Sequence, residues 1–144
     1  MPSTFSRIAS HQTSAAIVYE DEQTLAFMDI NPANRGHVLV ICRDEYPDIF
    51  SIPAETLMSV TRTVRRVALA LHAALHPDGL NIIQNNGAAA GQSVFHYHVH
   101  LIPRWEGDGA VRHWTPRPSR KDELQALAGQ IKEAMRGIGD TTRV

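Results

Sequence analysis

Apolar side chains along this chain form several short runs and two longer helical stripes. The short runs, bounded by turn residues, predict strands at residues 15–20, 24–29, 37–41, 80–84 and 94–102. Residues 53–75 carry apolar side chains at steps of three and four, which predicts an amphipathic helix opened by Pro53. The same spacing returns over residues 119–138, where Ser119 is a candidate cap. A few strands, a long central helix and a final helix predict an α+β fold.

The length of the chain favours one domain. With 144 residues and a mass of 16.0 kDa, it is long enough to bury one core and short for two. We therefore expect a single domain over residues 1–144, with its core over residues 15–109. The polar residues 1–14 are a candidate disordered arm, and residues 139–144 are a candidate disordered tail.

Composition and charge exclude several classes of protein. The net charge is −1 and the pI is near 6.7, so no basic surface favours nucleic acid or an anionic membrane. No apolar run approaches the roughly 18 residues of a membrane span, and residues 1–13 lack the apolar core of a signal peptide. Cys42 is the only cysteine, which excludes an internal disulfide and a zinc ribbon. We expect a soluble, cytoplasmic protein that binds neither nucleic acid nor membrane.

Three of the 8 histidines alternate along one predicted strand, as His96, His98 and His100. Side chains at alternate positions of a strand share one face. One interpretation is a solvated face that is rich in histidine, and another is a metal site. Same-face neighbours lie about 6.6 Å apart and the outer pair about 13 Å apart, whereas zinc requires each nitrogen at about 2.1 Å. Two neighbours could share an ion, but a third could not easily join them. An elongated phosphate fits better, because one ring can attack while its neighbours donate hydrogen bonds.

The loop before this strand, residues 85–93, offers donors on a backbone with little side-chain bulk. Asn85, Gln92 and Ser93 supply amide and hydroxyl groups, and small residues such as Gly91 let a ligand approach main-chain N–H groups. Such a loop alone is common between strands. Beside the histidines, it predicts donors for an oxyanion next to a nucleophile, as phosphoryl or nucleotidyl transfer requires.

These segments resemble the signature of the histidine triad (HIT) superfamily. The run reads Gln84-Asn85-Asn86-Gly87, then Ala90-Gly91-Gln92-Ser93-Val94, then His96-x-His98-x-His100-Leu101-Ile102-Pro103-Arg104. The similarity extends upstream to Val18-Tyr19-Glu20-Asp21, Ala26-Phe27-Met28-Asp29-Ile30-Asn31-Pro32 and Gly36-His37-x-Leu39-Val40-Ile41. The resemblance implies a five-stranded antiparallel sheet with one long central helix and a C-terminal helix. It also implies a homodimer in which the two sheets join across a two-fold axis.

The resemblance further implies roles for four histidines. His98 is the expected nucleophile, which attacks the α-phosphorus of a nucleotide and forms a nucleotidyl-histidine that water then hydrolyses. His100 is expected to contact phosphate, His96 to orient its neighbours, and His37 to lie close to the triad. The alternative for His37 is a core histidine at the start of a strand. Neutral imidazole suits the nucleophile, because a pKa near 6.5 leaves most of it unprotonated at pH 7.

The remaining candidate residues would bind a purine nucleotide. By the resemblance, Asp29 holds the ribose hydroxyls and Ile30 lies beside the base. Asn85, Gln92 and Ser93 bind phosphate oxygens and position the leaving group, within the loop that contains Gly91.

Bacterial relatives often hold a structural zinc, and here the resemblance breaks down. The usual cysteine ligands correspond to Ser3 and Ser6, and a usual histidine corresponds to Glu45, so only His96 of the four ligands remains. We therefore expect no zinc. Cys42 is expected to be a small buried apolar residue rather than a catalytic one.

Several functional alternatives stay open. The leading hypothesis is a nucleotide hydrolase or transferase that needs no cofactor and cleaves either nucleoside 5′-phosphoramidates and aminoacyl adenylates or dinucleoside polyphosphates. A polyphosphate substrate could require a divalent ion. The alternatives are a non-catalytic nucleotide-binding or scaffold dimer and a metal-binding protein. Trp114 resembles a C-terminal tryptophan that shapes the partner's site in one branch of the superfamily, or it anchors a loop.

Overall fold

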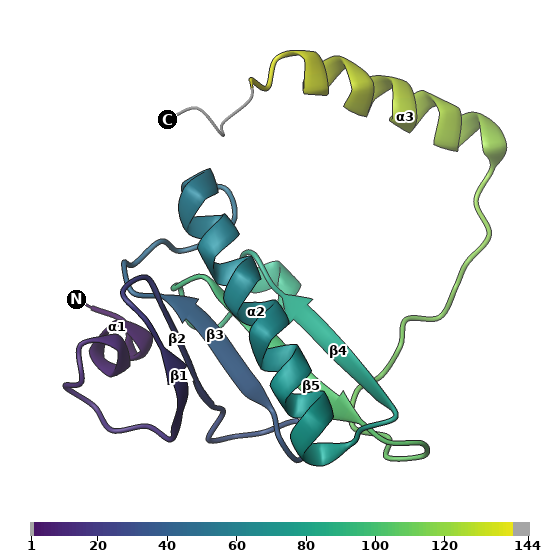
Figure 1. Ribbon diagram of the computed structural model, residues 1–144. Coiled ribbons are helices and arrows are strands. Elements are labelled where there is room, and N and C mark those ends of the chain that lie inside the picture. Colours follow the sequence, from purple (N-terminus) through teal and green to yellow (C-terminus); the bar gives the residue numbers. More distant parts are fainter. Residues whose placement is uncertain (1, 140–144) are drawn as a thin grey trace. The chain divides into compact units, whose positions relative to one another are not determined.

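A five-stranded antiparallel sheet organises the first part of the chain (Figure 1). The structure is a computed structural model that describes residues 2–139. Its elements are α1 (Thr4–Ala9), β1 (Ile17–Glu20), β2 (Thr24–Met28), β3 (Val38–Cys42), α2 (Ala54–Leu75), β4 (Gly79–Gln84), the 3-10 helix η1 (Ala88–Ala90), β5 (His98–Arg104) and α3 (Lys121–Arg136). The strands pair in the order β1-β2-β3-β5-β4, so β3 is central and β1 and β4 are the edges. The predicted α+β fold with this sheet is confirmed.

The chain divides into two units, one that ends at Ala110 and one that begins at Val111. The first contains the sheet, α1 and α2, and the second contains α3. Helix α3 begins after Arg120, whose side chain makes no capping hydrogen bond, rather than after the expected cap Ser119. Its apolar side chains Leu124, Leu127, Ile131 and Met135 are exposed, as is Ile138 just beyond the helix. Of the expected tail, residues 140–144 lie outside the described part of the chain.

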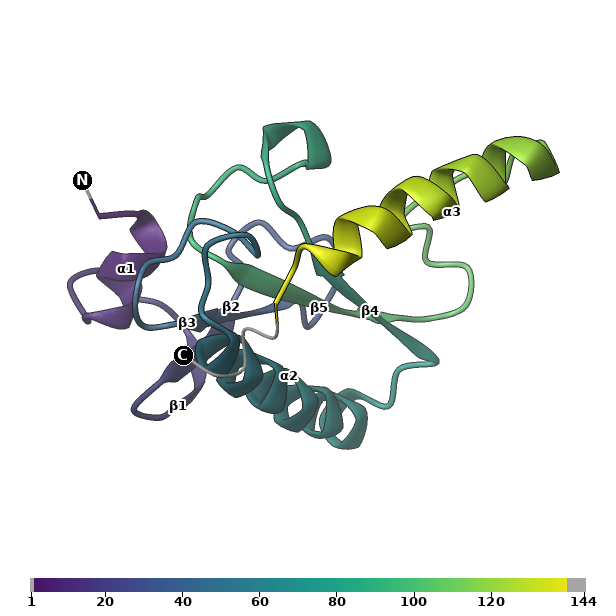
Figure 2. The same cartoon turned by 90° about the horizontal axis from the view of Figure 1, so that it is seen from above.

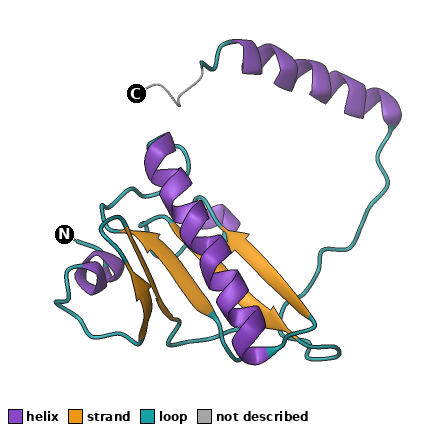
Figure 3. Ribbon diagram, viewed as in Figure 1, coloured by secondary structure: helices purple, strands orange, loops and turns teal. Residues whose placement is uncertain are grey.

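Each face of the sheet packs against a different helix (Figure 2). Helix α2 crosses one face of the sheet (Figure 3). There its apolar stripe packs against side chains of the three inner strands. This core contains Val38, Val40, Val60, Val64, Val67, Leu71, Val99 and Leu101. On the other face Leu25, Phe27, Leu39 and Ile41 pack with Ile8 and Ala9 of α1. No helix in the described residues is both long and apolar enough to cross a membrane.

Residues 1–14 were expected to form a disordered arm, but the structure contains a helix within this segment. Thr4–Ala9 form α1, and Ser3 is its N-cap, whose hydroxyl accepts the Ser6 N–H at 3.0 Å. Six residues are too few for a stable isolated helix. The burial of Ile8 and Ala9 against the sheet therefore stabilises α1, and this tertiary contact leaves little trace in local sequence.

The histidine strand begins later than expected. Residues 94–102 were predicted as a strand, but β5 covers His98–Arg104, and residues 94–96 form a bend. In this bend the His96 ring bonds the Cys42 carbonyl, and the Tyr97 N–H donates to the Tyr46 carbonyl at 2.6 Å. His98 and His100 therefore share one face of β5, whereas His96 precedes the strand.

A glycine at the turn before β3 gives a test of this packing. Gly36 has φ +85°, and a Cβ there would lie 2.6 Å from Leu75 Cδ1 and 3.0 Å from Pro103 Cγ. We expect Gly36→Ala to lower the free energy of unfolding by about 2 kcal/mol, because it combines backbone strain with overpacking. Urea unfolding measures this. Gly79→Ala is the matched control, since a Cβ at Gly79 meets nothing within 4 Å. Equal urea midpoints for the two variants would contradict the packing described.

Candidate active site

Two histidines of β5 meet a third, which directly precedes the neighbouring strand β3, on the α1 face of the sheet. The register pairs Ile41 with His98 and Leu39 with His100, which places both histidines on the sheet face that packs against α1. His37 directly precedes β3, and its Nε2 lies 2.9 Å from Nδ1 of His100. His37 was expected to lie near the triad or, alternatively, to be a core histidine. Its ring is buried and also contacts His100, so both descriptions fit.

The protonation state of His98 follows from one hydrogen bond. Its Nδ1 lies 2.6 Å from the carbonyl oxygen of His96. A carbonyl oxygen only accepts, so Nδ1 of His98 carries the proton. In the neutral ring Nε2 is then unprotonated, and its lone pair is available for attack.

A second set of hydrogen bonds fixes His37 and His100. The main-chain N–H of Ala33 donates to Nδ1 of His37 at 2.9 Å. The proton of neutral His37 is therefore on Nε2, which donates to Nδ1 of His100. His100 in turn carries its proton on Nε2. This chain of bonds makes His100 Nε2 a donor, suited to a phosphate oxygen.

Burial keeps these rings neutral. Desolvation lowers the pKa values of His37, His96 and His98 below their ordinary value. For His100, desolvation and the neighbouring His98 and His37 lower the pKa from 6.5 to about 4. At neutral pH the site therefore contains uncharged imidazoles, and His98 needs no separate base to free its nucleophilic nitrogen.

His96 is fully buried and is held from both sides. Its Nε2 lies 2.6 Å from the Cys42 carbonyl and must donate there, which leaves Nδ1 as an acceptor. The hydroxyl oxygens of Ser3 and Ser6 lie 3.2 and 3.3 Å from Nδ1. The His96 ring is thus held at both nitrogens, and it does not line the adjoining cavity.

A cavity of about 450 Å³ opens beside His98 and His100. Its walls are mainly apolar, with contributions from Phe5, Ile8, Phe27, Ile30, Leu39 and Val94. Its polar lining includes Asp29, Ser93, His98 and His100. Asp29 and Ile30 therefore both line this cavity, and Ile30 is 87% exposed. An apolar cavity of this size with a few convergent polar groups is typical of a small-molecule site.

Of the predicted loop residues, Ser93 lines this cavity, whereas Gln92 forms hydrogen bonds within the protein. Gln92 is buried, and its amide accepts the Gly87 N–H and donates to the carbonyls of Pro47 and Val94. Both ends of the Gln92 amide are therefore engaged within the protein, in contrast to the expected contact with phosphate. Asn85 is half-buried and lies near Gly91, whose φ of +95° favours glycine.

Asp29, His37 and His100 offer ligand atoms within 4.8 Å of one another, as a metal site would. Their spacing has a simpler cause. The 2.9 Å approach of the two rings is a hydrogen bond, and Nδ1 of His37 accepts from Ala33. Asp29 Oδ2 lies 3.6 Å from His37 Nε2, and its other oxygen accepts the Asn31 N–H. The cluster is thus already satisfied by hydrogen bonds.

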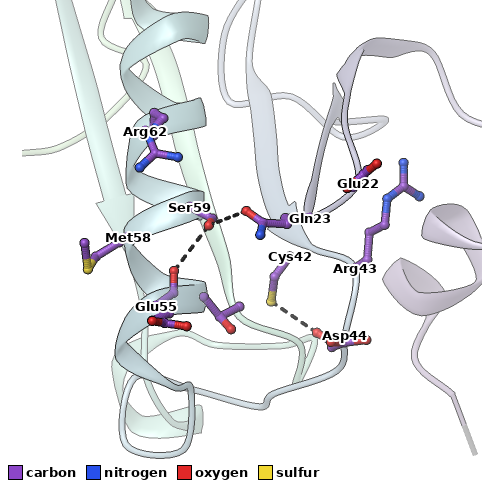
Figure 4. A pocket seen from close by; sticks show the side chains of 10 residues that line it. Glu22, Gln23, Cys42, Arg43, Asp44, Glu55, Met58, Ser59 and Arg62 are labelled. Atoms are coloured by element: carbon purple, nitrogen blue, oxygen red, sulfur yellow. Dashed lines mark hydrogen bonds between the residues drawn. The ribbon is translucent and has the colours of Figure 1, made fainter. Parts of the chain in front are cut away.

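A second pocket, of about 530 Å³, lies between α2 and the strand ends that carry Gln23 and Cys42 (Figure 4). Its lining is mostly polar, and the Ser59 hydroxyl donates to Gln23 within it. The Cys42 thiol donates to the Asp44 carbonyl, and burial raises its pKa to about 11. Cys42 is therefore a protonated, buried thiol at neutral pH, as expected for a packing residue.

Two groups in the site could not be predicted from the sequence. Phe5 of α1 packs edge-on against the His98 ring, with centroids 4.9 Å apart. The Ala33 amide sets the proton of His37. A lone phenylalanine in a polar N-terminal segment and a main-chain group carry no recognisable motif. Trp114, in contrast, is 85% exposed and belongs to the second unit.

Comparison with known proteins now identifies the family. The HIT domain model matches residues 10–107, and the chain belongs to this family. It is 45% identical over 107 residues to an uncharacterised HIT-like protein of Methanocaldococcus jannaschii, covering 74% of this chain and 82% of that protein. It is 36% identical over 121 residues to the adenylylsulfatase HINT3 of Arabidopsis thaliana, covering 84% of this chain and 60% of that protein. The family thus includes hydrolases.

Solved structures agree with this assignment. A HIT family protein of Bacillus subtilis superposes with a TM-score of 0.87 at 33% identity, covering 92% of this chain and 96% of that one. A zinc-bound histidine triad family protein of Mycobacterium smegmatis gives a TM-score of 0.71 at 38% identity, covering 90% and 95%.

The buried neutral histidines predict how stability depends on pH. The unfolded chain takes up these protons near pH 6.5, whereas the folded protein takes them up only at lower pH. The free energy of unfolding should therefore fall as the pH drops from 6.5 towards 4. Urea unfolding at several pH values measures this slope, and His100→Gln should flatten it. A free energy of unfolding that stays constant over this range would contradict the assignment of neutral rings.

Proposed function

We propose that this protein is a nucleotide hydrolase or transferase that acts through a covalent nucleotidyl-histidine on His98. The observation that carries the proposal is the unprotonated Nε2 of His98. Its proton is held on Nδ1 by the His96 carbonyl, and the ring lines the 450 Å³ cavity. A buried, neutral imidazole with a free lone pair at the wall of a cavity is suited to nucleophilic attack.

Two displacements at one phosphorus complete the reaction. In the first, the Nε2 lone pair of His98 forms a P–N bond to the α-phosphorus, and the bond to the leaving group breaks with its electron pair. The leaving group then takes up a proton. In the second, water forms a P–O bond, loses a proton, and the P–N bond breaks to restore His98. His100 donates from Nε2 to a phosphate oxygen, where negative charge is concentrated in both steps.

The cavity walls suit the nucleoside part of the substrate. Phe27 and Ile30 offer apolar surface to a purine base, and the Asp29 carboxylate offers acceptors to ribose hydroxyls. The relative named as an adenylylsulfatase supports an adenylyl conjugate as the substrate class. The leaving group is then an amine or carboxylate, as in phosphoramidates and aminoacyl adenylates, or a phosphate chain, with which a divalent ion would assist.

A turnover assay tests the proposal. Adenosine 5′-phosphoramidate and diadenosine tetraphosphate are assayed side by side with the wild type and with His98→Ala. We expect one substrate to be cleaved and the variant to lose a factor of about 1000 or more, since the nucleophile is gone. His72→Ala, at an exposed position of α2, is the matched control and should keep wild-type activity.

Two results of this assay would contradict the proposal. An active His98→Ala would show that another group attacks. A wild type that binds AMP but cleaves neither substrate would favour a non-catalytic nucleotide-binding or scaffold dimer.

We also propose that two copies form a homodimer. Strand β4 is an edge of the sheet, and its Ile82 side chain is 54% exposed. A strand with one unpaired edge and an exposed apolar side chain favours association. Light scattering after gel filtration should give twice the chain mass of 16.0 kDa, and Ile82→Asp should lower it. A monomeric wild type at micromolar concentration would contradict the dimer.

A further inference from the structure

Three residues far from the histidine strand in sequence converge on His96. Ser3 and Ser6 of the α1 segment point their hydroxyl oxygens at its Nδ1, at 3.2 and 3.3 Å. Glu45 completes the group, because its carboxylate accepts the main-chain N–H of Ser3 at 2.9 Å. The two hydroxyl oxygens lie 3.4 Å apart. We call Ser3, Ser6 and Glu45 the N-terminal latch.

The latch acts on the nucleophile through His96. The His96 ring is held by the latch at Nδ1 and by the Cys42 carbonyl at Nε2. The main-chain carbonyl of the same residue accepts the Nδ1 proton of His98. Phe5, from the helix that the latch anchors, packs against the His98 ring. Both the proton position and the orientation of His98 thus depend on contacts of α1.

These residues do not fit a zinc ion. Zinc binds deprotonated ligands, and serine hydroxyls at neutral pH are not among them. Nδ1 of His96 has one lone pair, which accepts the Ser6 hydroxyl hydrogen, while the Ser3 hydroxyl donates to the Ser6 oxygen. The Glu45 carboxylate accepts the Ser3 N–H. The pKa of Glu45 is lowered, first by its hydrogen bonds to Ser3, so the carboxylate stays charged and continues to accept.

We propose that the N-terminal latch positions His96, and through it the nucleophile His98, by hydrogen bonds in place of a structural metal. Ser3, Ser6 and Glu45 are therefore positioning residues, and α1 is part of the catalytic apparatus rather than an accessory arm. The effect on turnover rests on the proposed function. The effects on ring geometry and metal content do not.

Ser6 gives the cleanest kinetic test, because its hydroxyl does not cap α1 whereas that of Ser3 does. We expect Ser6→Ala to lower kcat about fivefold, the typical effect of one hydrogen bond, with little change in KM. Ser6→Thr keeps a hydroxyl and should restore kcat. Ser10→Ala is the matched control, since its hydroxyl bonds only the Arg7 carbonyl. An unchanged kcat in a folded Ser6→Ala protein would overturn the proposal.

Histidine ¹⁵N NMR tests the latch without turnover. The wild type should show His96 protonated at Nε2 and His98 protonated at Nδ1. In Ser6→Ala the Nδ1 signal of His96 and the signals of His98 should shift, whereas in Ser10→Ala they should not. His98 signals unaffected by Ser6→Ala would overturn the proposal even if the wild type cleaves no nucleotide.

Zinc titration gives a third, independent result. The wild type with added zinc should take up far less than one ion per chain, and EDTA should leave its melting temperature unchanged. The triple variant Ser3→Cys/Ser6→Cys/Glu45→His should take up one zinc per chain, because it supplies two thiolates and a second imidazole. One tightly bound zinc in the wild type would overturn the proposal.

Discussion

The chemistry of this protein depends on the hydrogen bond from Nδ1 of His98 to the main-chain carbonyl of His96, at 2.6 Å. This bond links the direction of the backbone to the protonation state of a side chain. A ring that must donate at Nδ1 presents a lone pair at Nε2 when it is neutral, and burial keeps it neutral by lowering its pKa. The fold therefore creates a nucleophile whose Nδ1 proton is held by a main-chain carbonyl rather than by a carboxylate.

Two helices support this hydrogen bond from opposite faces of the sheet. Helix α2 buries Val99 and Leu101 and fixes β5, whereas α1 covers the face from which His98 projects. Because the strand alternates, the residues that form the core and the residues that form the site are adjacent in sequence. A shift of the register by one residue would exchange the two sets.

The sequence predicted the parts that depend on periodicity. Alternation placed His98 and His100 on one face, and the helical stripe located α2 within a residue or two. It did not predict α1, whose stability comes from contacts between residues far apart in the chain, such as Ser3 with Glu45. The residue type of Gln92 also did not show that its amide forms hydrogen bonds with the main chain of Gly87 and Val94. An amide can form hydrogen bonds with either a backbone or a phosphate.

The covalent intermediate is the most direct test of the central claim. A single-turnover reaction with the cleaved adenylyl substrate, quenched within milliseconds and digested for mass spectrometry, locates the attachment site. The account predicts an adenylyl group on the peptide that contains His98, bound through Nε2, and its disappearance at the rate of product formation. An adduct on His96 or His100, or product formation with no adduct at any time, would contradict it.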